Sequence, residues 1–148
     1  MRKLFYFLGL SLFLMSCNQN SGESGSGAEG SSNAKVDQLK GEVMKIHDDA
    51  MHKKGDVQSL LTTLKKAEFS STEDSLAIQE AYKALKNADK GMMQWMREFK
   101  QVDDQGWSED EKIAYLKEEL EKMNSISNST NEALALANET VETVAGNK

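Results

Sequence analysis

The sequence predicts an all-α protein, an antiparallel up-down-up three-helix bundle with a coiled-coil-like core. Apolar residues recur at helical spacing over three long segments, polar breaks at residues 69–72 and 101–107 separate these segments, and the chain contains no proline. Apolar side chains repeating every three or four positions form one face of a helix. Long helices joined by short loops pack antiparallel around such faces. The bundle domain is expected to span residues 35–148.

The first helix is expected to run from Val36 to the break after residue 68. Gly41 and Gly55 do not shift its repeat, so one continuous helix is predicted, with Gly55 as its weak point because a helical glycine costs about 1 kcal/mol relative to alanine. Its core positions form two rows, Val36, Val43, Ala50, Val57 and Leu64, and Leu39, Ile46, Lys53, Leu60 and Ala67.

The second helix is expected to begin at the serines that follow Phe69. Either Ser71 with Asp74 or Ser70 with Glu73 would form its N-cap, because a serine hydroxyl accepts a hydrogen bond from a backbone N–H of the first turn. Tyr82 and Met96 widen its core stripe, which comprises Ile78, Ala81, Leu85, Ala88, Met92, Trp95 and Phe99.

The third helix is expected to begin at a capping box formed by Ser108 and Glu111 and to end at Gly146. Ser127 and Thr130 place a polar layer in its core, where they could bond the hydroxyl of Tyr82. It is the longest helix, so residues 137–145 are expected to extend beyond the turn between the first two helices. Its two rows are Ile113, Leu120, Ser127, Leu134 and Val141, and Leu116, Met123, Thr130, Ala137 and Val144.

The first 16 residues have the organisation of a secretory signal, with a basic start, an apolar run over residues 4–15 and the small Ser16 before Cys17. The run is shorter than the ~20 residues that a membrane-spanning helix needs. Leu14-Met15-Ser16-Cys17 resembles the lipobox of bacterial lipoproteins, which implies cleavage before Cys17 and acylation of that cysteine. An ordinary signal peptide with an incidental cysteine is the alternative.

Residues 18–34 contain no apolar side chain larger than alanine and are rich in glycine and serine. Residues 17–34 are therefore expected to be a flexible tether between the lipid and the bundle. Loss of residues 1–16 changes the net charge from −6 to −8, an acidic balance that disfavours nucleic acid as a partner. The expected location is the bacterial cell envelope. Asn18 in place of aspartate, with no acidic cluster after Cys17, favours the periplasmic face of the outer membrane.

Methionines and a histidine are predicted to gather at one level of the bundle. Thioether sulfur and imidazole suit Cu(I), and methionine with histidine can ligate haem. The other interpretation is ordinary core, because methionine fills irregular space beside aromatic rings. We expect core packing and no cofactor, with copper or haem binding as the alternative. The residues are Met44, His47 and Met51 of the first helix and Met92, Met93 and Met96 of the second.

No motif of a catalytic site occurs, since the chain has neither a Gly-x-Ser-x-Gly sequence nor a phosphate-binding loop. We therefore expect a non-enzymatic module that acts through contacts with a protein partner. Asp74-Ser75-Leu76 resembles the O-glycosylation site of Bacteroidota envelope proteins, which would place a glycan on Ser75. The start of a helix explains Asp74 equally well.

Two segments, residues 42–51 and residues 88–96, resemble a group of small Bacteroidota lipoproteins that often carry the label "viral A-type inclusion protein". The resemblance covers most of residues 36–123 and implies a helical lipoprotein. That family has no established activity, so the resemblance implies no functional residue.

Overall fold

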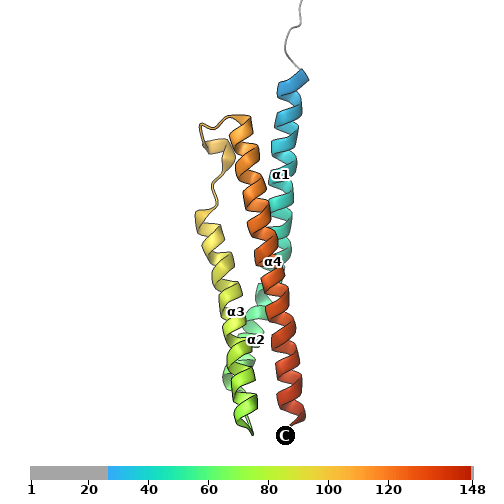
Figure 1. Ribbon diagram of the computed structural model, residues 1–148, viewed down its shortest axis with the longest axis vertical. Coiled ribbons are helices and arrows are strands. Elements are labelled where there is room, and N and C mark those ends of the chain that lie inside the picture. The colour runs from blue at the N-terminus through green and yellow to red at the C-terminus, as the bar shows by residue number, and fades with distance from the viewer. Residues whose placement is uncertain (1–26, 148) are drawn as a thin grey trace, which may run out of the picture.

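The computed structural model describes the backbone of residues 27–147 and the side chains of residues 33–147. This part of the chain is all-α and contains no strand, which confirms the predicted fold class. α1 and α2 run in one direction, α3 returns, and α4 lies beside them along the length of an elongated bundle (Figure 1). No helix among these residues is long and apolar enough to cross a membrane. The elements are α1 (Gly27–His52), α2 (Lys54–Lys66), α3 (Thr72–Glu98), the short 3₁₀ turn η1 (Val102–Asp104) and α4 (Glu109–Gly146).

The first predicted helix is broken at Lys53, so the prediction of one continuous helix is wrong. The backbone N–H of Lys53 donates to the carbonyl of Ala50 at 3.1 Å. This bond spans three residues, as in a 3₁₀ turn, and not the four residues of an α-helical bond. Lys53 falls in a row of apolar residues, where its ammonium would be costly to bury without a partner. At the break this ammonium instead bonds the side chain of Asn131 on α4.

The start of α1 also differs from the expected boundary. The helix begins at Gly27 rather than at residue 35, so it includes residues 27–34 of the predicted tether. The rest of that tether, with Cys17 and the predicted signal, lies outside the described residues.

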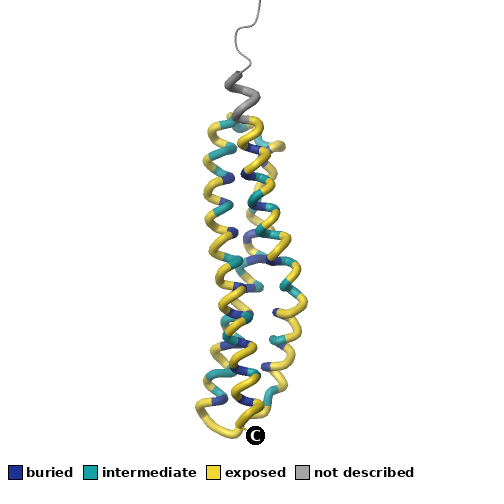
Figure 2. The backbone as a smooth tube through the Cα atoms, turned by 90° about the vertical axis from the view of Figure 1, so that its right-hand side faces the viewer, coloured by how far each residue is buried: buried dark blue, intermediate teal, exposed yellow. Residues whose placement is uncertain are grey.

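The core runs along the inner face of every helix and forms three clusters (Figure 2). Of the two rows predicted for the first helix, the one from Val36 in α1 to Leu64 in α2 is buried throughout. The other is buried only at Leu39, and Leu61 is buried in place of the predicted Leu60. Leu85 at the middle of α3 is fully buried, as predicted. The cluster near the start of α1 contains Val36, Leu39, Val102 and Leu116. The middle cluster contains Val43, Ala50, Met92, Trp95 and Met123. The third contains Val57, Leu61, Leu64, Ala81, Leu85, Ala88, Ala133 and Ala137.

The buried stripe of α4 is rotated relative to the prediction. Glu119, Ala133 and Thr140 are buried, whereas the predicted Leu120 and Leu134 beside them are only partly buried. α4 contacts α1, α2 and α3, so it buries a wider arc than one helical seam. The hydroxyl of the buried Thr130 donates to the carbonyl of Ile126 in its own helix.

The prediction that residues 137–145 extend beyond the turn between the first two helices is wrong. Ala137, Thr140 and Val144 are buried, and the side-chain amide of Asn147 donates to Asp74 at the start of α3 at 2.9 Å. α4 therefore ends level with the α2–α3 turn.

The extra length of α4 lies at its start, where it extends past the end of α3 (Figure 1). The segment between the two helices lies along this part of α4 and buries Val102 beside Leu116. An ion pair between Lys40 of α1 and Asp103 fixes the same segment to the bundle.

Both helix starts were predicted from local sequence. The Ser71 hydroxyl accepts from the backbone N–H of Asp74 at 3.0 Å, and Ser108 and Glu111 form a capping box. The bonds from Ser108 hold the pKa of Glu111 below its ordinary value. These caps set where α3 and α4 begin.

Candidate functional site

The predicted methionine–histidine cluster is part of the middle core. Met92 is buried, and the partly buried Met44 and Met51 pack against the same group of side chains. Met123 of α4, which was predicted as a core residue of the third helix and not as part of the methionine–histidine cluster, also belongs to this group. Met96 is 42% exposed. Met44, Met51, Met92 and Met123 therefore fill space between α1, α3 and α4, as this flexible side chain commonly does.

Two of the remaining candidate ligands already have polar partners. The ring of His47 lies 5.5 Å from that of Trp95, and its Nδ1 lies 2.9 Å from a carboxylate oxygen of Asp48. The ammonium of Lys54 lies 3.3 Å from the sulfur of Met93, and a positive charge in that place opposes a metal cation. Among the described residues no group of three or more His, Cys, Asp or Glu could hold a metal ion.

Four aromatic rings continue from this cluster toward the start of α4. The ring centroids of Trp95 and Phe99 are 4.7 Å apart, those of Phe99 and Tyr115 are 6.0 Å apart, and those of Tyr115 and Trp107 are 5.0 Å apart. The Tyr115 hydroxyl accepts from the backbone N–H of Lys100 at 2.7 Å, and burial raises the pKa of Tyr115. The row therefore packs the segment after α3 against the bundle.

A buried carboxylate links α3 to α4 beside the same cluster. Glu119 is only 4% exposed and accepts from the indole N–H of Trp95 and from the ammonium of Lys122, each at 2.7 Å. The bond to Glu119 raises the pKa of Lys122. The sequence interpretation missed Glu119, although its position between Leu116 and Met123 on the buried face was the signal for it.

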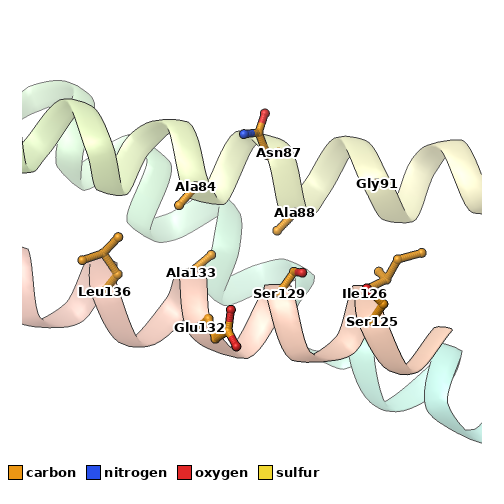
Figure 3. A pocket seen from close by; sticks show the side chains of 10 residues that line it. All are labelled: Ala84, Asn87, Ala88, Gly91, Ser125, Ile126, Ser129, Glu132, Ala133 and Leu136. Carbon is orange, nitrogen blue, oxygen red and sulfur yellow. The ribbon is translucent and has the colours of Figure 1, made fainter. Parts of the chain in front are cut away.

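A groove lies between α3 and α4 and is seen from close by in Figure 3. Its hollow has a volume of about 410 Å³. The methyl groups of Ala84 and Ala88 point from α3 toward α4, and Ala133 and Ser129 point back from α4 (Figure 3). Its lining, here called the α3–α4 groove, comprises Ala84, Asn87, Ala88, Gly91, Ser125, Ile126, Ser129, Glu132, Ala133 and Leu136.

The α3–α4 groove continues in both directions along the helices. A hollow of about 270 Å³ shares Gly91, Ser125 and Ile126 with it and reaches Glu98. Another of about 400 Å³ shares Leu136 and reaches the start of α3 at Ser71. The groove therefore follows almost the whole of α3. Small side chains form the floor of its middle part, which leaves room there for side chains of a partner to enter.

The other predicted site residues lie apart from this groove. Ser75 is partly buried in the first turn of α3, where its hydroxyl accepts from the side chain of Gln79 at 3.5 Å. Cys17 lies outside the described residues, so its acylation stays a prediction.

Comparison with known proteins found no matching family model, no matching curated protein and no matching solved structure. The resemblance to small Bacteroidota lipoproteins therefore stays a prediction.

Proposed function

We propose that this protein is a non-enzymatic helical module, anchored by lipid in the bacterial cell envelope, that binds a protein partner in the α3–α4 groove. The observation that carries the proposal is the length and lining of this groove. Small side chains form the floor of its middle part, Asn87, Ser125 and Glu132 lie exposed along it, and it follows almost all of α3.

A helix of the partner is the occupant that fits this shape. Two antiparallel helices with small facing residues leave a channel into which the side-chain ridge of a third helix packs. Recognition of this kind uses apolar anchors at i, i+3, i+4 and i+7 on one face of an amphipathic helix. Glu132 at the edge and the acidic balance of the chain favour basic residues on the flanks of that helix.

The anchor follows from the predicted acylation of Cys17. α1 leaves the bundle at the end opposite the α2–α3 turn (Figure 1). A lipid on Cys17 would therefore hold that end of the bundle near the membrane. The bundle itself is at least as long as α4, about 57 Å at 1.5 Å per residue. The favoured location is the periplasmic face of the outer membrane. We propose neither a nucleic acid partner nor a cofactor for this protein.

Site-specific photo-crosslinking in the native envelope tests the groove. The full chain carries a photoreactive residue in place of Glu132, and one discrete protein adduct is expected. Ser129→Trp on the same chain should remove this adduct, because the indole fills the groove. Asn128→Trp, at an exposed position outside the groove lining, is the matched control and should leave the adduct unchanged. An adduct that survives Ser129→Trp would contradict binding in the groove.

Intact-mass spectrometry of the chain from native envelopes tests the anchor. The expected species begins at Cys17 and carries acyl chains on it. An unmodified Cys17, or a precursor that retains residues 1–16 as the main species, would contradict the lipid anchor without affecting the groove.

A further inference from the structure

The end of the bundle at the α2–α3 turn displays two large apolar side chains. Phe69 is 58% exposed and Leu76 is 61% exposed, and the remaining large hydrophobic residue that is exposed in the described part of the chain is Met96. Isolated apolar residues are common on protein surfaces. Here two of the three lie at the same end, called the distal tip below and defined by residues 65–76.

A hollow lies at the same end, next to the turn that carries Phe69, and its lining is partly polar, with Thr63, Lys66, Glu68 and Thr140. It has a volume of about 410 Å³ and opens between the end of α2 and the end of α4. A cavity of about 150 Å³ is enough to hold a benzene ring, so this hollow has room for a phenyl side chain. Phe69 is largely exposed and is not among the residues that line the hollow. The apolar lining comprises Leu64, Ala67, Ile78, Val141, Val144 and Ala145.

We propose that two copies of this chain associate through their distal tips, with Phe69 of each copy seated in the hollow of the other. A two-fold contact must be self-complementary, because the same surface serves both partners. The distal tip meets this requirement, since it carries both a protruding ring and a hollow that accepts one.

The charges of the distal tip favour a protein surface over a bilayer. Lys65 and Lys66 are exposed at the end of α2, Glu68 is exposed in the turn, and Glu73 is exposed at the start of α3. Two-fold pairing brings the basic end of one copy toward the acidic helix start of the other, which favours association and fixes its orientation. Glu73 lies in sequence between Phe69 and Leu76, and its charge would be costly to place in a lipid interior.

The contact is small, so the dimer is expected to be weak, with a dissociation constant on the order of 10 µM to 1 mM. Tip-to-tip pairing directs the starts of the two α1 helices away from each other. If Cys17 carries a lipid, as the proposed function states, the two lipid anchors of such a pair lie at its opposite ends.

Sedimentation equilibrium of the full chain in density-matched non-ionic detergent tests the pairing. The wild-type chain should pass from monomer to dimer as concentration rises. Phe69→Ala should weaken the dimer by about 30-fold or more, the usual effect of removing a buried aromatic anchor. Met96→Ala, which also removes an exposed large apolar side chain, is the matched control and should leave the dissociation constant unchanged.

A second variant fills the hollow without changing Phe69. Ala145 lines the hollow and is exposed, so Ala145→Trp should block the hollow and weaken the dimer as Phe69→Ala does. A mixture of the two variants should form a heterodimer, because the free hollow of one accepts the Phe69 of the other. Circular dichroism melting confirms that each variant is folded.

Three results would overturn the proposal. The first is a wild-type chain that stays monomeric at millimolar concentration. The second is a dimer that Phe69→Ala leaves at full strength. The third is a loss of thermal stability in Phe69→Ala with no change of mass, which would place Phe69 in the hollow of its own chain. None of these results depends on the groove partner or on the acylation of Cys17.

Discussion

The indole N–H of Trp95 on α3 donates a 2.7 Å hydrogen bond to the carboxylate of Glu119 on α4, and both residues are buried. This bond sets the level at which the two helices meet, because each side chain has a polar atom that needs a partner inside the core. Lys122 bonds the second carboxylate oxygen and balances its charge.

Glu119→Leu is expected to lower the free energy of unfolding by about 1–3 kcal/mol, because the buried indole N–H of Trp95 loses its acceptor. Glu119→Gln should cost less, since the amide oxygen can still accept. Urea denaturation followed by tryptophan fluorescence measures both. The exposed neighbour provides the control, and Glu118→Gln should change stability by less than about 0.5 kcal/mol.

Leu85→Asp is expected to destabilise the bundle by about 3–5 kcal/mol, because it buries a charge without a partner at a position that is 0% exposed. Thermal unfolding followed by circular dichroism measures the loss. Asn87→Asp adds the same charge at an exposed position of the same helix and should be nearly neutral. A Leu85→Asp variant with wild-type stability would show that α3 does not pack by this face.

The bond between Asp74 and Asn147 predicts a dependence of stability on acid pH. Hydrogen bonds from Asn147, then from Ser71, hold the pKa of Asp74 below its ordinary value of 3.8. A carboxyl group with a lowered pKa in the folded state stabilises that state above its unfolded pKa and loses this contribution as pH falls through the folded value. The wild-type chain should therefore lose stability below about pH 3.8 faster than Asp74→Asn does.

Urea titrations from pH 6 to pH 2 measure this difference. In an Asn147→Ala background, the loss of stability in acid with Asp74 present should come closer to the loss with Asp74→Asn. The reason is that Asn147→Ala removes the largest cause of the lowered pKa of Asp74. Equal slopes for the wild-type chain and Asp74→Asn throughout this range would contradict a role for the Asp74 carboxylate.

Copper binding is expected to be no tighter in the wild-type chain than in a His47→Ala, Met51→Leu double variant. Met92 is buried in the core, Met51 packs against the same cluster, and Met93 faces the ammonium of Lys54. Titration of metal-free protein with Cu(I) against a competing chelator makes the comparison. Wild-type binding that is tenfold tighter or more would instead support the soft-ligand site.

Most of the core could be predicted from sequence because the apolar period depends on local spacing alone. Val43 and Leu85 were placed in the core on this basis, and the starts of α3 and α4 followed from Ser71 and Ser108, whose hydroxyls act within one helical turn. Glu119 was missed because a charged residue is expected to be exposed unless it has partners in the core. Its partners Trp95 and Lys122 are known only from the folded structure.

The sequence by itself determined the all-α class, the three segments of the bundle and most of the face that α3 presents to the core, since these depend on residues close together in the chain. Tertiary structure alone decided how the helices are shifted along one another. The segment after α3 lies along the first part of α4 and buries Val102 there, so α4 begins beyond the end of α3. As a result, the other end of α4 lies level with Asp74. That shift decides which side chains of α3 and α4 face each other. The α3–α4 groove and the hollow beside Phe69 therefore arise from contacts between residues far apart in sequence, which no local pattern records.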